Sequence, residues 1–364
     1  MDKEFYIKLI FNSLMNNIQP AKIHKNLFNF ATANEWSSTI FSIMKKHLTL
    51  LCLFLGLMSL AHPQQMPRLS PGDTIAIVST ASDTDTSRVF PFVRFMESKG
   101  FVILVADGVF DNEQGFAGPA KQRAHIFQQL LDRPDVKAII CARGGYGTVE
   151  ILDQLDFTAF RQHPKWICGF SDITALHSHL HTLGFPTLHS TMPVSFHADD
   201  PDNANNTSLL SALHGDTLCY SFEPMPENRC GTATAPLVGG NLSLLYSLLE
   251  SPSSISTDGK ILFIEDVDEN IYHIHRMLVA LDRAGKLKNL KGVIVGGMTR
   301  IRVDDYFMDE TINAAILRIF EKYDYPVCFD FPAGHGGKNV ALRLGTTVTL
   351  TVAPDSCTLL SLPK

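Results

Sequence analysis

The sequence lacks the features that mark nucleic-acid, metal and redox proteins. Its net charge is −6 over 364 residues, so it has no basic excess of the kind that binds nucleic acid. None of its seven cysteines forms a Cys-x-x-Cys pair, which argues against a zinc ribbon or a thioredoxin-type site. Cys219 and Cys230 flank a loop, and whether they pair in an oxidising compartment is left open.

The chain also has little that would span a membrane. Its apolar run, Leu48 to Leu60, is too short for a transmembrane helix. The run follows a basic segment and ends in Ser59-Leu-Ala61, which is the pattern of a secretory signal peptide over residues 44–61. We therefore interpret residues 1–43 as an extension of the gene model and expect a periplasmic protein. The alternative is that residues 44–61 form a buried helix or an uncleaved anchor, with a cytoplasmic protein as the other location.

Apolar strands alternate with amphipathic helices over residues 67–192, which we interpret as an N-terminal domain. The predicted strands are 74–78, 101–105, 136–141 and 165–168, and the predicted helices are 88–99, 120–131, 149–155 and 172–182. Because the strands are apolar on both faces, they predict a parallel sheet covered by helices on both sides. Ligands of such sheets bind beyond the carboxyl ends of the strands, where Ser82, Gly144 and Ser171 fall.

A second α/β unit is predicted over residues 235–364. The periodicity fails over 193–234, and residues 197–206 have loop composition, so we interpret 193–234 as an interdomain linker. Strands are expected at 260–264, 292–295 and 327–330, with helices after Gly239-Gly240 and at 271–284 and 311–322. Residues 346–352 and 358–362 are expected to form a closing antiparallel pair.

Ser171 stands out at a predicted strand-to-helix turn. Gly169 precedes it by two residues, as in the nucleophile elbow Gly-x-Ser-x-Gly, but Ile173 takes the place of the second glycine. Such a turn lifts a hydroxyl above the sheet and places the next backbone N–H, that of Asp172, at the positive end of a helix. The alternative is that Ser171 only caps the helix.

Two further strand-end residues complete a candidate triad with Ser171. A hydroxyl needs a base, and the base needs an orienting acceptor. His335 lies in a glycine-rich loop, and Glu265 follows an apolar strand. Each has a simpler interpretation, because His335 could be a turn residue and Glu265 could be one solvated acid of a run that includes Glu269. The glycine-rich segment Arg143–Gly147 lacks the Lys-Ser/Thr of a P-loop and is not Gly-x-Gly-x-x-Gly, so it is interpreted as a source of backbone N–H groups.

Five motifs in this order resemble the LD-carboxypeptidases, the serine peptidase family that includes the microcin C immunity peptidase. They are Ala142-Arg-Gly-Gly-Tyr-Gly147, Cys168-Gly-Phe-Ser-Asp-Ile-Thr-Ala-Leu176, Gly239-Gly-Asn-Leu242, Phe263-Ile-Glu-Asp-Val-Asp-Glu269 and Gly334-His335. The resemblance runs from about residue 70 to the end. It implies a flavodoxin-like N-terminal domain, a smaller α/β C-terminal domain and a homodimer. It also implies a Ser171, Glu265 and His335 triad.

The resemblance further implies an LD-carboxypeptidase that cleaves a terminal D-alanine from murein tetrapeptides. The backbone N–H groups of Gly144, Gly145 and Asp172 would form the oxyanion hole. No metal and no cofactor are expected, and the scattered histidines at 177, 179, 181, 189 and 197 are interpreted as packed or solvated. Two alternatives remain: an amidase acting on a peptidyl-nucleotide, and a two-lobed periplasmic binding protein. Of these two alternatives, only the amidase would share the triad.

Overall fold

The computed structural model describes residues 66–303, 307 and 311–362, all within the unit Pro63–Lys364. The predicted gene-model extension and signal peptide, residues 1–61, lie outside the described residues. Within the described part of the chain, no helix has the length and apolarity needed to cross a membrane.

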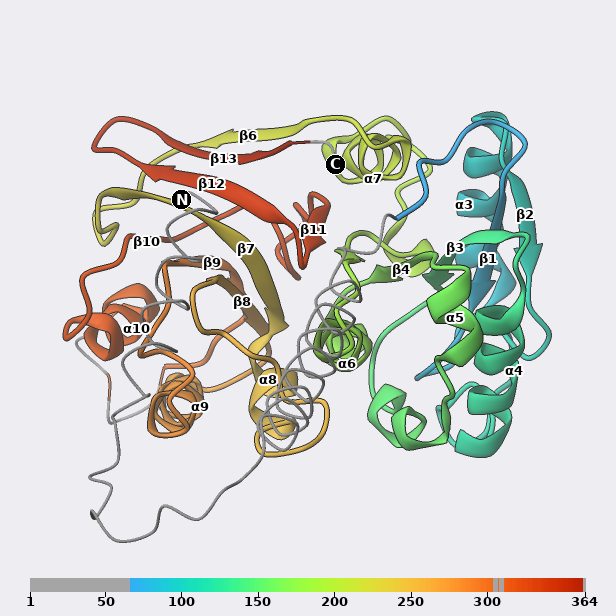
Figure 1. The fold of residues 1–364 in the computed structure, drawn as a ribbon, viewed down its shortest axis with the longest axis horizontal. Helices are drawn as coiled ribbons and strands as arrows, with labels where there is room; N and C mark the ends of the chain where they lie inside the picture. Colours follow the sequence, from blue (N-terminus) through green and yellow to red (C-terminus); the bar gives the residue numbers. More distant parts are fainter. Residues whose placement is uncertain (1–65, 304–306, 308–310, 363–364) are drawn as a thin grey trace, which may run out of the picture. The chain divides into compact units, whose positions relative to one another are not determined.

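A six-stranded sheet forms the first half (Figure 1), in the order β11-β5-β4-β3-β1-β2. Its parallel strands are β1 (Thr74–Val78), β2 (Val102–Val105), β3 (Val136–Cys141), β4 (Trp166–Gly169) and β5 (Thr187–His189). The sixth strand, β11 (Leu342–Leu344), comes from near the end of the chain and runs antiparallel to β5. The predicted parallel sheet is therefore present, with an edge strand that the sequence pattern did not indicate.

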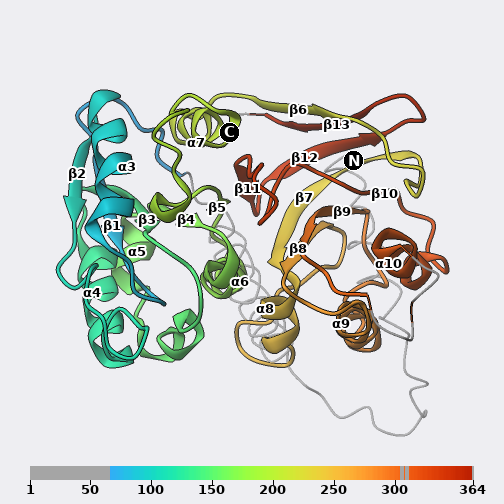
Figure 2. The ribbon, with the colours of Figure 1, turned by 180° about the vertical axis from the view of Figure 1, so that it is seen from behind.

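Helices cover both faces of this sheet (Figures 1 and 2). One apolar core packs α4 (Ala120–Asp132), α5 (Thr158–Gln162) and α6 (Thr174–Thr182) against the sheet. A second core, on the other face, packs α3 (Thr86–Ser98) and α7 (Ala204–His214). Asp85 is the N-cap of α3, because its carboxylate accepts hydrogen bonds from the backbone N–H groups of Ser87 and Arg88.

The second sheet has seven strands, in the order β10-β9-β8-β7-β12-β13-β6. They are β6 (Leu218–Phe222), β7 (Gly231–Asn241), β8 (Ile261–Val267), β9 (Gly292–Thr299), β10 (Val327–Cys328), β12 (Thr347–Val352) and β13 (Cys357–Ser361). Strands β7 to β10 are parallel, and the rest pair antiparallel. The expected closing pair is confirmed as β12 and β13. Helices α8 (Leu242–Ser247), α9 (Ile271–Arg283) and α10 (Ile312–Phe320) pack on one face.

The segment interpreted as a linker carries structure of its own. It contains a short 3₁₀ helix at Pro193–Ser195, then α7, β6 and the start of β7. Residues 204–206 were expected to be loop, but they form the first turn of α7, since the Asn203 side chain accepts hydrogen bonds from the Asn205 and Asn206 N–H groups. An asparagine-rich run is typical of loops because its side chains bond to nearby backbone, and here one such bond caps a helix.

Three smaller expectations also differ from the structure. Gly239 and Gly240, expected to form a glycine turn before a helix, lie in strand β7. A Cβ on Gly239 would lie 1.8 Å from the Phe263 carbonyl oxygen, so this close approach of β7 to β8 requires glycine. The predicted helical turns at 149–155 are 3₁₀ helices at Thr148–Glu150 and Leu152–Gln154. Cys219 and Cys230 are exposed free thiols, so the pairing left open by the sequence does not occur in this structure.

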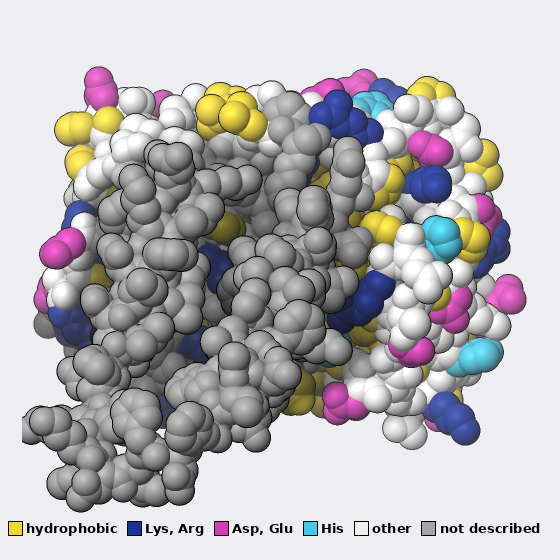
Figure 3. Space-filling model, in the orientation of Figure 1, with side chains coloured by type: hydrophobic (Ala, Val, Ile, Leu, Met, Phe, Trp, Pro, Cys, Tyr) yellow, Lys and Arg dark blue, Asp and Glu magenta, His cyan; other side chains and the backbone are white. Residues whose placement is uncertain are grey.

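The described surface carries both signs of charge. On the face shown in Figure 3, basic and acidic side chains are interspersed over the described residues. This mixed distribution agrees with the small net charge of −6.

Candidate active site

Ser171 sits on a strained turn at the carboxyl end of β4. Its backbone φ is +64°, in the left-handed region that few non-glycine residues occupy. Gly169 makes the turn possible, because a Cβ there would lie 2.8 Å from the Ile173 side chain. A short 3₁₀ helix, Ser171–Ile173, follows and has no side-chain cap. The helix-cap interpretation of Ser171 is therefore not what the structure has, and its hydroxyl points elsewhere.

The Ser171 hydroxyl meets the imidazole of His335. The distance from Ser171 Oγ to His335 Nε2 is 3.1 Å, and His335 Nδ1 lies 2.6 Å from Glu265 Oε2. With Nδ1–H donating to the carboxylate, Nε2 is the acceptor for the serine O–H. Serine comes from the first sheet, glutamate from β8 in the second sheet and histidine from a loop after β10, so the structure brings together three residues far apart in sequence.

Glu265 is fully buried within β8, which runs on to Val267 and not only to residue 264 as expected. It is 0% exposed, and its second oxygen, Oε1, has no hydrogen-bond partner. Gly334 allows this approach, because a Cβ on Gly334 would lie 2.9 Å from the Glu265 side chain. The rival acid Glu269 points to a different histidine, with its Oε2 2.5 Å from His273 Nδ1.

Three buried polar side chains form hydrogen bonds that hold the loop carrying His335 in place. Asn339 Oδ1 accepts hydrogen bonds from the Gly334 N–H at 2.9 Å and from His189 Nε2 at 3.0 Å. The Asn339 N–H donates to Asn205 Oδ1 at 2.7 Å. The loop that carries His335 is thus tied to β5 and to α7, and both belong to the first half of the molecule.

Charge and burial act in opposite directions on His335. Burial lowers its pKa, but the hydrogen bond and charge of Glu265, with a contribution from Asp266, leave the pKa raised above 6.5. For the neighbouring carboxyl of Asp266, burial raises the pKa. Asp266 accepts hydrogen bonds from Ser243 and from the Asn241 side chain. Glu265 thus stabilises the imidazolium form of His335, the form that a general base reaches after it has taken a proton.

The glycine-rich loop lies directly over Ser171. A Cβ on Gly144 would lie 3.1 Å from Ser171 Cβ and 3.3 Å from the Asp172 nitrogen. Gly145, at φ +100°, lies against Ser82, and a Cβ there would fall 2.1 Å from the Ser82 hydroxyl. The predicted oxyanion residues Gly144 and Asp172 are therefore adjacent to the serine hydroxyl, with Gly145 next along the loop.

A buried arginine and a buried aspartate form hydrogen bonds with the backbone at the end of this loop. Arg123 is 1% exposed, and its Nη1 donates to the Gly147 carbonyl at 2.8 Å. Asp172 Oδ2 accepts from the Thr148 N–H at 2.8 Å, and burial raises the pKa of this carboxyl. The first bond ties the end of the glycine-rich loop to α4, and the second ties Thr148 to the turn that carries Ser171.

Nothing in the sequence indicated that Asn339, His189 and Arg123 support the site. Asn339 lies in a loop, His189 ends a three-residue strand and Arg123 lies on an amphipathic helix, and only the fold brings each to its partner. The histidines from α6 onward are placed as interpreted, for His177 and His189 are buried, and burial lowers their pKa values to about 4 and about 3. Among the residues that the structure describes, no group of three or more His, Cys, Asp or Glu side chains is arranged to hold a metal ion.

This arrangement suits acyl transfer. A hydroxyl, an imidazole and a carboxylate are hydrogen-bonded in sequence, and Gly144 packs against Ser171 and the Asp172 nitrogen. Such a set can deprotonate the hydroxyl as it attacks a carbonyl and can hold the negative charge that develops on the carbonyl oxygen.

Comparison with known proteins identifies the family. The LD-carboxypeptidase N-terminal domain matches residues 75–190, and the LD-carboxypeptidase C-terminal domain matches residues 234–350. A probable murein peptide carboxypeptidase of Bacillus subtilis is 32% identical over 293 residues, which cover 78% of this chain and 91% of that protein. The microcin C7 self-immunity protein of Escherichia coli is 26% identical over 274 residues, covering 65% of this chain and 78% of that protein.

A solved structure has the same fold. The muramoyltetrapeptide carboxypeptidase from Oxalobacter formigenes superposes with a TM-score of 0.73 at 26% identity, covering 80% of this chain and all of that one (100%). The predicted fold, a flavodoxin-like parallel-sheet domain with a smaller α/β domain, is confirmed. The motifs, the fold and the relatives agree, and the chain belongs to the LD-carboxypeptidase family of serine peptidases.

Proposed function

We propose that the protein is a serine LD-carboxypeptidase that removes the terminal D-alanine from murein tetrapeptides through Ser171, His335 and Glu265. The observation that carries the proposal is the hydrogen-bonded chain from Ser171 through His335 to buried Glu265. It is supported by relatives whose names include murein peptide and muramoyltetrapeptide carboxypeptidases.

The first half-reaction makes an acyl-enzyme. Ser171 Oγ attacks the carbonyl carbon of the residue before D-alanine while its proton passes to His335 Nε2. The oxyanion is held by the N–H groups of Asp172 and of Gly144 or Gly145, a contribution of about 3–4 kcal/mol for each donor. Collapse of the tetrahedral intermediate breaks the C–N bond, and His335 returns the proton to the departing amine. D-alanine leaves with its amino group complete.

The second half-reaction restores the enzyme. A water molecule attacks the ester carbon while His335 Nε2 takes one of its protons. The C–O bond to Ser171 breaks, and His335 returns the proton to the serine oxygen. Glu265 stays ionised throughout and stabilises the imidazolium that forms in each half-reaction. No metal and no cofactor enters either step.

A peptidyl-nucleotide amidase remains the second candidate, because the microcin C7 self-immunity protein shares the family at 26% identity. The same serine chemistry would act there on a different acyl group. A binding protein is a weaker candidate, since ligand binding alone does not require a strained serine joined to an imidazole and a buried carboxylate.

Digestion of purified murein tetrapeptides tests the proposal, with the products identified by mass spectrometry. We expect loss of one alanine from a peptide that ends in D-alanine and none from its matched control ending in L-alanine. A peptidyl-nucleotide amide assayed in parallel separates the second candidate. Cleavage of that amide alone would favour the amidase, whereas turnover of neither substrate, with no labelling by a serine-directed phosphonate, would favour a binding protein.

A further inference from the structure

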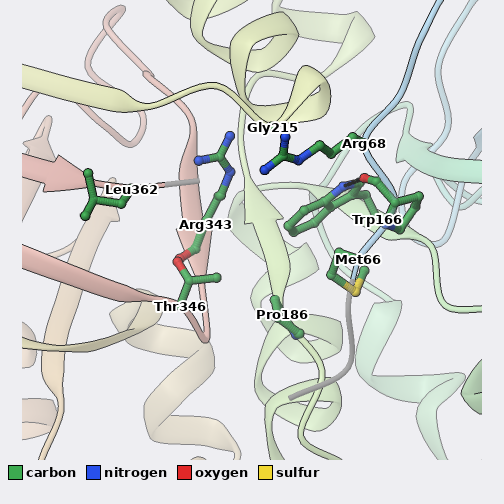
Figure 4. A pocket seen from close by; sticks show the side chains of 9 residues that line it. Met66, Arg68, Trp166, Pro186, Gly215, Arg343, Thr346 and Leu362 are labelled. Atoms are coloured by element: carbon green, nitrogen blue, oxygen red, sulfur yellow. Dashed lines mark hydrogen bonds between the residues drawn. The ribbon is translucent and has the colours of Figure 1, made fainter. Parts of the chain in front are cut away.

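A cavity lies at the opposite end of β4 from Ser171. Trp166 begins β4, and Pro186 precedes β5, so the cavity opens at the amino ends of these strands. It is about 30 Å³ in volume, and its walls include Arg68, Gly215 and Arg343 (Figure 4). None of the described residues that line it is acidic. The catalytic proposal uses no residue of this cavity.

Arg343 supplies a buried and incompletely bonded positive charge. The residue is 5% exposed, and its Nη2 donates to the carbonyls of Ser211 at 3.2 Å and Ala212 at 3.1 Å, in the last turns of α7. Its Nη1 is buried and has no hydrogen-bond partner. A buried donor of a charged group that lacks an acceptor is unfavourable, and native proteins rarely leave one without a ligand or a water.

Arg68 brings a second guanidinium to the same space. Its side chain passes across Gly215, where a Cβ would lie 2.7 Å from Arg68 Cγ. Figure 4 shows the Arg68 and Arg343 side chains among those that line this cavity, below the Gly215 backbone in that view. Burial lowers the pKa of Arg343, Tyr220 and Asp216 act to raise it, and the charge of Arg68 adds to the lowering. Two like charges near one cavity favour an anion between them.

We propose that this cavity binds a carboxylate or phosphate group between Arg68 and Arg343. The guanidinium fork pairs with groups that present two oxygens, which carboxylates and phosphates both do. A bound anion would join three parts of the chain that are distant in sequence: the segment before β1, the end of α7 and strand β11.

Titration of the full chain with inorganic phosphate and, separately, with acetate tests this proposal. Trp166 lines the cavity and is a built-in reporter, and a Trp36→Phe background removes the other tryptophan from the signal. Ionic strength is held constant with sodium chloride, because screening alone alters surface electrostatics. We expect a saturable change in Trp166 emission with at least one of the two anions and none with chloride. Saturation by both identifies a general oxyanion site, and saturation by one identifies its chemical class.

Substitutions locate the site. Arg343→Gln and Arg68→Gln should each weaken binding by about tenfold or more, since each removes charge-assisted hydrogen bonds. Arg133→Gln is the matched control, because Arg133 is a half-exposed arginine paired with Asp135 outside the cavity. If Arg343→Gln fails to fold, the Arg68→Gln variant tests the proposal, because Arg68 is exposed and its substitution should not disturb the core. The absence of any saturable signal, or equal affinity in wild type and Arg68→Gln, would overturn the proposal.

Discussion

The serine hydroxyl is the atom on which the proposed chemistry depends, so its removal is the first prediction. Ser171→Ala should lower kcat by a factor on the order of 10⁴ or more, because no nucleophile remains. The fold should survive, since the Ser171 side chain caps no helix. Measurements of kcat and of the melting temperature on one preparation check both statements. An active variant that has lost about 1 kcal/mol would instead mean that the residue is only a helix cap.

The choice of carboxylate gives the second prediction. Glu265→Gln keeps the shape of the side chain but removes the charge beside His335 Nδ1, so kcat should fall by about 10⁴. Glu269→Gln is the matched control, because Glu269 contacts His273 and not His335. We expect it to cost about 0.3–1 kcal/mol of stability, through the helix dipole, with little change in kcat. An inactive Glu269→Gln beside an active Glu265→Gln would show that the acid role is wrongly assigned.

The raised pKa of His335 gives a prediction on pH. The base must be neutral to take the serine proton, so kcat/KM should rise with pH, with a midpoint above 6.5. The free energy of unfolding depends on pH in the opposite direction, because it should fall as pH rises. The imidazolium's contribution is fully present below the unfolded-state pKa and is lost as pH rises through the folded-state pKa. Asp266 adds to the raised pKa, and Arg300 opposes it.

Paired pH profiles of activity and unfolding free energy check this prediction. Glu265→Gln should move the midpoint of its residual activity to lower pH, because the largest stabilising charge has gone. A wild-type midpoint below 6.5 would contradict the prediction.

At the scale of elements, the loop after β10 depends on the one glycine that touches Glu265. Gly334 has φ +115°, and a Cβ there would lie 2.9 Å from Glu265. Gly337, in the same loop, has φ +83° with nothing within 4 Å of such a Cβ. Gly337→Ala should therefore cost only backbone strain, about 1–2 kcal/mol. Gly334→Ala should cost about 1–3 kcal/mol more and also lower kcat, because it displaces the carboxylate. Urea unfolding and kcat measure the two effects, and equal kcat values in the two variants would refute the contact argument.

Elements with a clear period could be predicted from the sequence, and short ones could not. The strand Val136–Cys141 and the helix from Ala120 were predicted because a long apolar run and a 3.6-residue repeat are local patterns. Strands β5 and β11 have three residues each, too few for a pattern, and their pairing joins distant parts of the chain. Local sequence carries no information on such a pairing.

The residues of the candidate site also fall into those that the sequence could indicate and those that it could not. Ser171, Glu265 and His335 could be selected because each stands where an apolar strand or a glycine-rich loop marks a sheet edge. Asn339 and Arg123 could not, since their roles come from backbone groups that only the fold brings within hydrogen-bond distance.

At the scale of the whole molecule, we predict export with cleavage near His62. The basic segment, the apolar run and the small residues Ser59 and Ala61 motivate this expectation. Intact-mass analysis of the periplasmic fraction should find a chain that begins near His62. A cytosolic protein that retains residues 1–61 would contradict it. The homodimer implied by the resemblance is a separate expectation, which light scattering of the purified protein measures.

The contribution of β11 to the first sheet has a consequence for the timing of activity during synthesis. Ribosomes release a chain from its amino end, so Ser171 emerges well before His335 and before Leu342–Leu344. Until those last segments arrive, β5 has no edge partner, and the serine has neither a base nor the loop that Asn339 braces. A nascent or truncated chain is therefore without hydrolytic activity on the proposed mechanism. The order of the residues along the chain would protect the cell that makes this peptidase until the last segments have folded.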